Sequence, residues 1–83
     1  MRPYWLMFDN LPKFSGLGLG AGITAYSEQE ACEIAALHFG SEIKIESVKP
    51  IRTTDEIEQN HVRPNMGNLL IRGVWFPKGF ETL

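Results

Sequence analysis

Cysteine is almost absent from the sequence, with a single residue, Cys32, in 83 positions. One thiol cannot form a disulfide within the chain, whereas small secreted domains usually rely on several disulfides to compensate for a thin core. The shortage therefore favours a reducing compartment, and we expect a cytoplasmic protein.

Long apolar runs and an excess of positive charge are also missing. The apolar run near the start of the chain covers residues 4–8 and ends at Asp9, which is too short for a signal-peptide core or a membrane span. The formal net charge is −2, and this balance does not favour nucleic acid as a partner. The sequence thus predicts neither a membrane segment nor a nucleic-acid interface.

No motif in the sequence specifies a cofactor. Gly16, Gly18 and Ala21 match part of a dinucleotide-binding pattern. That pattern needs a strand directly before it and a helix directly after it, and residues 23–25 are strand-like. We expect the glycines to form a flexible loop, with Gly22 allowing the helix to approach the second strand closely.

The composition is that of a globular domain. Hydrophobic residues make up 43% of the chain and charged residues 22%, and both values are near the averages of folded proteins. A chain of this length has room for one domain. We therefore expect residues 1–83 to form a single unit of modest stability.

Four segments have the composition of β-strands. Residues 4–8 are aromatic and aliphatic, residues 20–26 follow a glycine-rich loop and are expected to pair with them, and residues 69–76 are apolar on both faces. Residues 43–48 alternate between apolar and charged side chains. This alternation predicts a half-buried strand near a sheet edge, which Pro50 ends.

A helix is predicted over residues 28–39. Ser27 and Glu30 have the spacing of a capping box, in which each side chain binds the other residue's amide, and Gly40 is the residue type that commonly closes a helix. At about 100° per residue, the helix has a core-facing stripe and an opposite outer face. The stripe comprises Ala31, Cys32, Ile34, Ala35, His38 and Phe39, and the outer face comprises Gln29, Glu30, Glu33 and Leu37.

The remaining local patterns predict structure rather than a metal site. Cys32 and His38 lie about 120° apart around the helix, so we expect a core histidine and no metal ligand. Thr53 and Glu56 repeat the capping-box spacing and predict a short helix over residues 54–60. Residues 63–66 carry proline and asparagine at central turn positions and are expected to form a turn.

The predicted order is β-β-α-β-short α-β, which is an α+β fold. We expect a two-layer sandwich in which one main helix packs on a sheet of about four strands. One main helix cannot cover both faces of such a sheet. The second face must therefore be covered by a partner, or by the loop over residues 9–19 together with Phe80 and Leu83.

The densest polar segment covers residues 60–67 and is followed by Arg72. His61 could titrate near neutral pH beside Arg63 and Arg72, which could hold a phosphate or carboxylate. These three residues are therefore candidate catalytic residues for an anionic substrate. In the alternative interpretation Asn60 ends the short helix, the segment forms a turn, and His61 and Arg72 bind loop carbonyls.

Several segments together resemble a family of small bacterial proteins with no established activity. They are HVRPNMG at residues 61–67, RGVWFP at residues 72–77, Tyr4-Trp5-Leu6 and Gly22-Ile23-Thr24-Ala25. The resemblance implies a bacterial source and no mechanism. Small acidic bacterial proteins of this kind are similar to immunity proteins, which neutralise a cognate toxin by binding it.

Negative charge is concentrated in the middle of the chain. Residues 27–60 carry eight acidic and three basic side chains, and the remainder carries two acidic and five basic ones. Such a split can steer a charged partner. With the resemblance, it predicts a protein-binding module, an immunity-type inhibitor that binds a basic toxin domain through Glu30, Glu33 and Leu37.

Two alternatives from other classes stay open. One is a small enzyme or ligand-binding protein that acts on an anionic metabolite through the histidine and two arginines of the polar segment. The other is a subunit of a homodimer, a larger homo-oligomer or a phage-related assembly.

Overall fold

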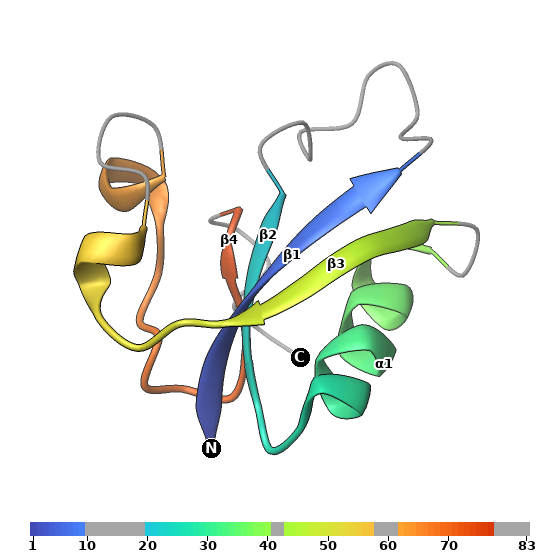
Figure 1. The fold of residues 1–83 in the computed structure, drawn as a ribbon, viewed down its shortest axis with the longest axis horizontal. Helices are drawn as coiled ribbons and strands as arrows, with labels where there is room; N and C mark the ends of the chain where they lie inside the picture. The colour runs from blue at the N-terminus through green and yellow to red at the C-terminus, as the bar shows by residue number, and fades with distance from the viewer. Residues whose placement is uncertain (10–19, 41–42, 58–61, 78–83) are drawn as a thin grey trace.

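Four antiparallel strands form one sheet in the order β3-β1-β2-β4 (Figure 1). The structure is a computed structural model that describes residues 1–9, 20–40, 43–57 and 62–77. With one helix packed on the sheet, the expected two-layer α+β sandwich is confirmed. The elements are β1 (Arg2–Asp9), β2 (Ala21–Ala25), α1 (Glu28–Phe39), β3 (Lys44–Pro50), the 3-10 helices η1 (Thr54–Glu56) and η2 (Arg63–Asn65), and β4 (Gly73–Phe76).

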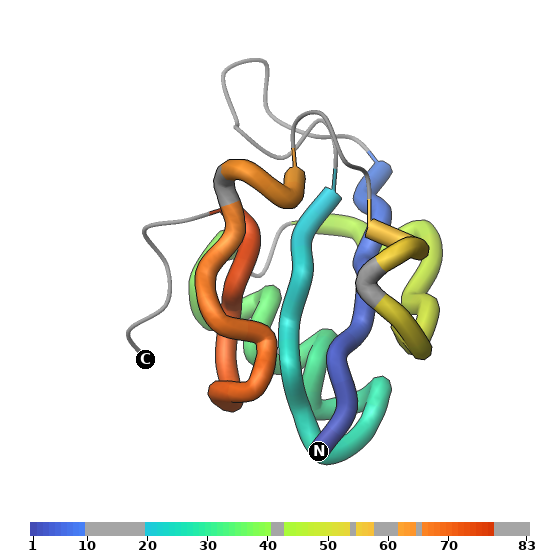
Figure 2. Tube along the Cα trace, turned by 90° about the vertical axis from the view of Figure 1, so that its left-hand side faces the viewer, coloured from blue at the N-terminus to red at the C-terminus, as the bar shows by residue number. Residues whose placement is uncertain are grey.

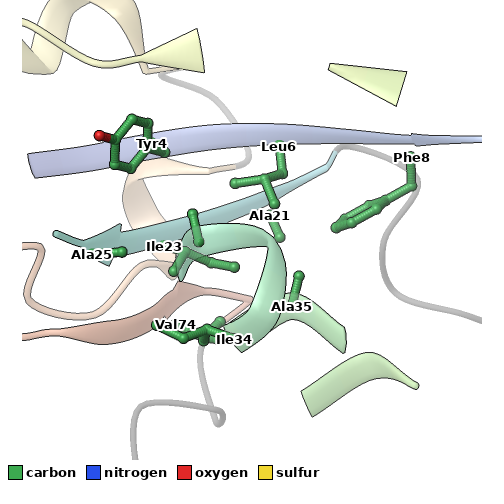
Figure 3. Close-up of a cluster of buried hydrophobic side chains, with 10 residues drawn as sticks. Tyr4, Leu6, Phe8, Ala21, Ile23, Ala25, Ile34, Ala35 and Val74 are labelled. Atoms are coloured by element: carbon green, nitrogen blue, oxygen red, sulfur yellow. The ribbon is translucent and has the colours of Figure 1, made fainter. Parts of the chain in front are cut away.

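The first core lies between α1 and one face of the sheet. Successive side chains of a strand point to opposite faces, so alternate residues of β1 face α1. Figure 3 shows these side chains meeting others from β2, β4 and α1. The buried members are Tyr4, Leu6, Phe8, Ala21, Ile23, Ala25, Ala31, Ile34, Ala35 and Val74, and the partly buried Phe39 packs against them.

Both ends of α1 lie where the sequence predicts them. Ser27 Oγ accepts a hydrogen bond from the Glu30 amide at 3.1 Å. The Glu30 carboxylate binds the Tyr26 amide, at 2.9 Å, one residue earlier than the expected Ser27 amide. At the other end the Gly40 amide donates to the Ala36 carbonyl at 3.0 Å, and Gly40 has a φ of 102°, which favours glycine.

The second face of the sheet is covered by the connection between β3 and β4. This connection contains η1 and η2 and lies on the side opposite α1 (Figures 1 and 2). The loop and terminal residues proposed as a cover from the sequence lie outside the described residues. The connection supplies Ile51, Ile57 and Val62 to a second core with Trp75 and Phe76, against which Trp5, Met66 and Leu69 pack.

A β-bulge places two consecutive aromatic residues of β4 in this second core. Gly22 of β2 pairs with Phe76, and the register then shifts by one residue, which leaves Trp75 as the extra residue. The ring of Trp5 lies 6.0 Å from Trp75 and 5.6 Å from Phe76, measured between centroids. A Cβ on Gly22 would overlap the six-membered ring of Trp75. The close approach at Gly22 is therefore to Trp75, and the expectation of an approach by the helix is corrected.

Several predicted bounds shift. β3 is a half-buried edge strand as expected, but it continues through Pro50 because the nitrogen of that residue, opposite Tyr4, points away from β1. β4 begins only at Gly73, and residues 69–72 form a turn and bend instead of strand. The expected short helix is the single turn η1, with residues 58–61 outside the described part, and η2 replaces the predicted turn.

Candidate functional site

Tyr26, Glu30 and Arg72 meet where β2 leads into α1. Arg72 Nε donates to Glu30 Oε1 at 3.1 Å and Nη2 donates to Oε2 at 2.8 Å, so the ion pair is bidentate. The Arg72 Cζ atom also lies 5.7 Å from the centroid of the Tyr26 ring, within the range of a cation–π interaction. Two parallel hydrogen bonds fix the plane of the guanidinium, which a single contact would not do.

The turn before Arg72 presents two apolar side chains to solvent. Asn68 Oδ1 accepts from the Leu70 amide at 2.9 Å, and the Asn68 carbonyl accepts from the Ile71 amide at 3.3 Å. The buried hydroxyl of Thr24 in β2 donates to the Leu69 carbonyl at 2.7 Å and ties the turn to the sheet. Leu70 is 77% exposed and Ile71 59%. The hydrogen-bonded backbone of the turn therefore directs the Leu70 and Ile71 side chains toward solvent.

We name the set Tyr26, Glu30, Leu70, Ile71 and Arg72 the Tyr26–Arg72 surface. The Tyr26 side chain is 67% exposed. Three large exposed side chains thus lie next to the ion pair: the Tyr26 ring is beside Arg72, and Leu70 and Ile71 directly precede Arg72 in the turn. Tyrosine and arginine are the residue types that most often dominate binding energy in protein interfaces.

The Glu30 carboxylate is ionised at neutral pH. The hydrogen bonds from Arg72, and after them the one from the Tyr26 amide, hold the pKa of Glu30 below its ordinary value, because they favour the charged form. The negative charge of Glu30 is therefore matched by Arg72. Its availability to a partner is smaller than the helix pattern alone suggests.

No family model, curated protein or solved structure matches this chain. The resemblance of its segments to small bacterial proteins stays a prediction. Any proposal about function therefore depends on the surfaces and charges of the chain itself.

The partner-binding residues predicted on α1 lie on its outer face. Glu33 is exposed and Leu37 is 76% exposed. Glu30 is half-buried and bound to Arg72. Their role in binding a partner stays a prediction. The ion pair with Arg72 makes Glu30 part of the Tyr26–Arg72 surface.

The candidate catalytic residues are not assembled in the described part of the chain. His61 lies outside the described residues. Arg63, in η2, is 4.0 Å from Asp55, whereas Arg72 binds Glu30. The turn over residues 69–72 lies at the opposite end of the molecule from η2 (Figure 2). The two arginines therefore serve separate ion pairs.

The described residues contain neither a metal-binding cluster nor an activated thiol. No group of three or more histidine, cysteine, aspartate or glutamate side chains there could hold a metal ion. Burial raises the pKa of the Cys32 thiol, and so do Glu28 and Glu33, which disfavours a reactive thiolate at neutral pH. Among the same residues, no helix is long and apolar enough to cross a membrane.

The sequence interpretation missed Tyr26, Leu70 and Ile71. A strand over residues 69–76 would have buried the two aliphatic residues on the sheet. One local signal argues for the turn, namely that Asn68 stands directly before the run and Arg72-Gly73 interrupt it. The contact with Glu30 joins residues 42 positions apart, and no local pattern reveals it.

Proposed function

We propose that this chain is a cytoplasmic protein-binding module, and specifically an immunity-type inhibitor of a basic toxin domain. The supporting observation is the exposure of Tyr26, Leu70 and Ile71 beside the Glu30–Arg72 ion pair. Clustered exposed apolar side chains with polar groups at their rim are typical of interaction sites.

The backbone of this surface is ordered before any partner arrives. The Asn68 turn and the Thr24–Leu69 hydrogen bond hold the backbone of residues 69–71, and the bidentate ion pair holds the Arg72 side chain. A partner would therefore meet a surface whose backbone conformational entropy has already been lost on folding. Such preorganisation strengthens binding.

The charges around the surface support a cationic partner. Glu30 is matched by Arg72, which leaves Glu33 as the exposed carboxylate on the outer face of α1, while Glu28 is exposed in the first turn of the helix. Acidic side chains at the rim of an interface accelerate the approach of a positively charged protein. Leu37, one turn beyond Glu33, extends the apolar area along α1.

The test is binding kinetics against candidate toxin domains, chosen for a net positive charge among proteins encoded near this gene. Leu70→Ser and Tyr26→Ser should speed dissociation by about tenfold or more, because they remove contacts at the centre of the interface. Glu33→Lys should slow association, and this loss should shrink as salt rises. Glu46→Lys, a matched charge reversal on the edge strand β3, should leave both rates unchanged.

Other outcomes would contradict the proposal. Wild-type kinetics in the Leu70 and Tyr26 variants would place the partner elsewhere. A concentration-dependent dimer that these variants abolish would favour the homo-oligomer alternative. Turnover of an anionic metabolite that is lost in His61→Ala would favour the enzyme.

A further inference from the structure

Arg2 and Arg52 lie at the same end of the β1–β3 ladder, on its two strands. The register pairs Tyr4 with Pro50, and the Ile51 amide donates to the Pro3 carbonyl at 2.9 Å, so the ladder continues one step beyond β3. If this register continues by one more residue, Arg52 lies opposite Arg2. Like charges at directly opposed positions destabilise a sheet.

The two arginines line one open hollow. Its volume is about 550 Å³, and its walls are Met1, Arg2, Pro3, Pro50, Ile51 and Arg52. A volume of this size is within the range of small-molecule sites. The prolines make the walls rigid, because each has a fixed φ.

Within the described part of the chain, neither guanidinium has an ion-pair partner. The other two described arginines, Arg63 and Arg72, each have one. The carboxylate of Glu56 accepts instead from the backbone amides of Arg52 and Thr53, at 2.5 and 3.3 Å. These two hydrogen bonds, from the Arg52 amide first, hold the pKa of Glu56 below its ordinary value, and the charges of Arg52 and Lys49 lower it further. This carboxylate is therefore committed to the backbone next to the hollow.

We propose that the hollow binds a small molecule through a phosphate or carboxylate group held between Arg2 and Arg52. A bound oxyanion converts the unfavourable pair of like charges into two favourable ones. The guanidinium fork matches the geometry of both groups. This site shares no residue with the Tyr26–Arg72 surface, so anion binding can be tested independently of the proposed protein partner.

The test is an NMR titration of the whole chain with pyrophosphate and, separately, with citrate, at constant ionic strength. We expect saturable shifts of the amides of residues 2 and 51–53. Arg2→Gln and Arg52→Gln should each weaken binding by about tenfold or more, since each removes a charge-assisted contact. Arg63→Gln, which removes an arginine outside the hollow, should bind like the wild type. The tighter of the two anions identifies the group that the hollow prefers.

Thermal unfolding supplies a second readout. Without anion, the melting temperature of Arg2→Gln should equal or exceed that of the wild type, because a repulsion is removed. Pyrophosphate or citrate should raise the wild-type melting temperature more than that of the variant at the same anion concentration. Non-saturable shifts, or an equal loss of binding in Arg63→Gln, would overturn the proposal and indicate general screening of positive charge.

Discussion

At the scale of single residues, the space above Gly22 is what allows the second core to close. The six-membered ring of Trp75 occupies the position that a Cβ on Gly22 would take. Trp75 is one of the largest fully buried side chains of the described structure. The glycine thus serves packing between β2 and β4, and its role does not require a ligand.

Gly22→Ala should destabilise the fold by about 1–3 kcal/mol, because overpacking forces neighbouring side chains from their preferred rotamers. Denaturant unfolding measures this cost. The same substitution should cost less in a Trp75→Leu background, since the smaller side chain leaves room. Equal costs in the two backgrounds would show that Gly22 and Trp75 do not interact.

The Glu30–Arg72 ion pair makes stability depend on acid pH. Because the pKa of Glu30 is lower in the folded chain than its ordinary value of 4.5, its charge stabilises the fold at neutral pH. This contribution decreases as the pH falls below 4.5 and is lost once the pH passes the folded-state pKa. Glu30→Gln should therefore lower the melting temperature at pH 7, and its difference from the wild type should narrow in acid.

The matched control for this pH series is Glu33→Gln, an exposed carboxylate one turn further along α1. Its melting temperature should follow the wild type across the same range. If the difference in melting temperature between Glu30→Gln and the wild type stayed constant with pH, the contact would not depend on the charge of Glu30.

At the scale of elements, the connection between β3 and β4 packs on the sheet as α1 does, although it contains no long helix or strand. Its only regular elements in the described residues are η1 and η2. It nevertheless buries Ile51, Ile57 and Val62 against the sheet. Burial, rather than secondary structure, holds this segment in place.

Ile57→Ala should cost about 2–5 kcal/mol, the usual range for a large aliphatic residue cut back in a core. The side chain is 3% exposed. Ile71→Ala, the same change on the exposed turn, should alter stability by less than about 0.5 kcal/mol. Urea unfolding of the two variants decides between a packed connection and one that lies loosely on the sheet.

The elements that the sequence predicts well are those whose signals are local. Ser27 and Gly40 mark the ends of α1, and the helical period separates buried Ile34 from exposed Leu37. The turn over residues 69–72 was predicted as strand because distant contacts, from Thr24 and Glu30, decide its conformation. For the same reason, Leu70 and Ile71, two of the five residues of the Tyr26–Arg72 surface, are not predicted as exposed.

At the scale of the whole molecule, the end of the sheet where β1 begins carries both proposed binding regions. Arg2 pairs with Ala25 in the ladder between β1 and β2, and Tyr26 follows directly. The hollow therefore lies on the β3 side of this end and the Tyr26–Arg72 surface on the β2 side. The net charge of −2 gives no sign of this cluster of arginines, and neither does any local segment, because Arg2, Arg52 and Arg72 are far apart in the sequence.

The position of β1 in the sheet also determines when the molecule can complete its folding during synthesis. β1 is made first yet lies between β3 and β2, while the later strands β3 and β4 form the two edges. The first core can begin to assemble from β1, β2 and α1 once the chain as far as Phe39 has emerged from the ribosome. The second core must wait for Trp75 and Phe76, so the apolar side of Trp5 remains uncovered on the growing chain until nearly all of the described sequence has emerged. This interval is when a chaperone or a neighbouring nascent chain would meet the protein.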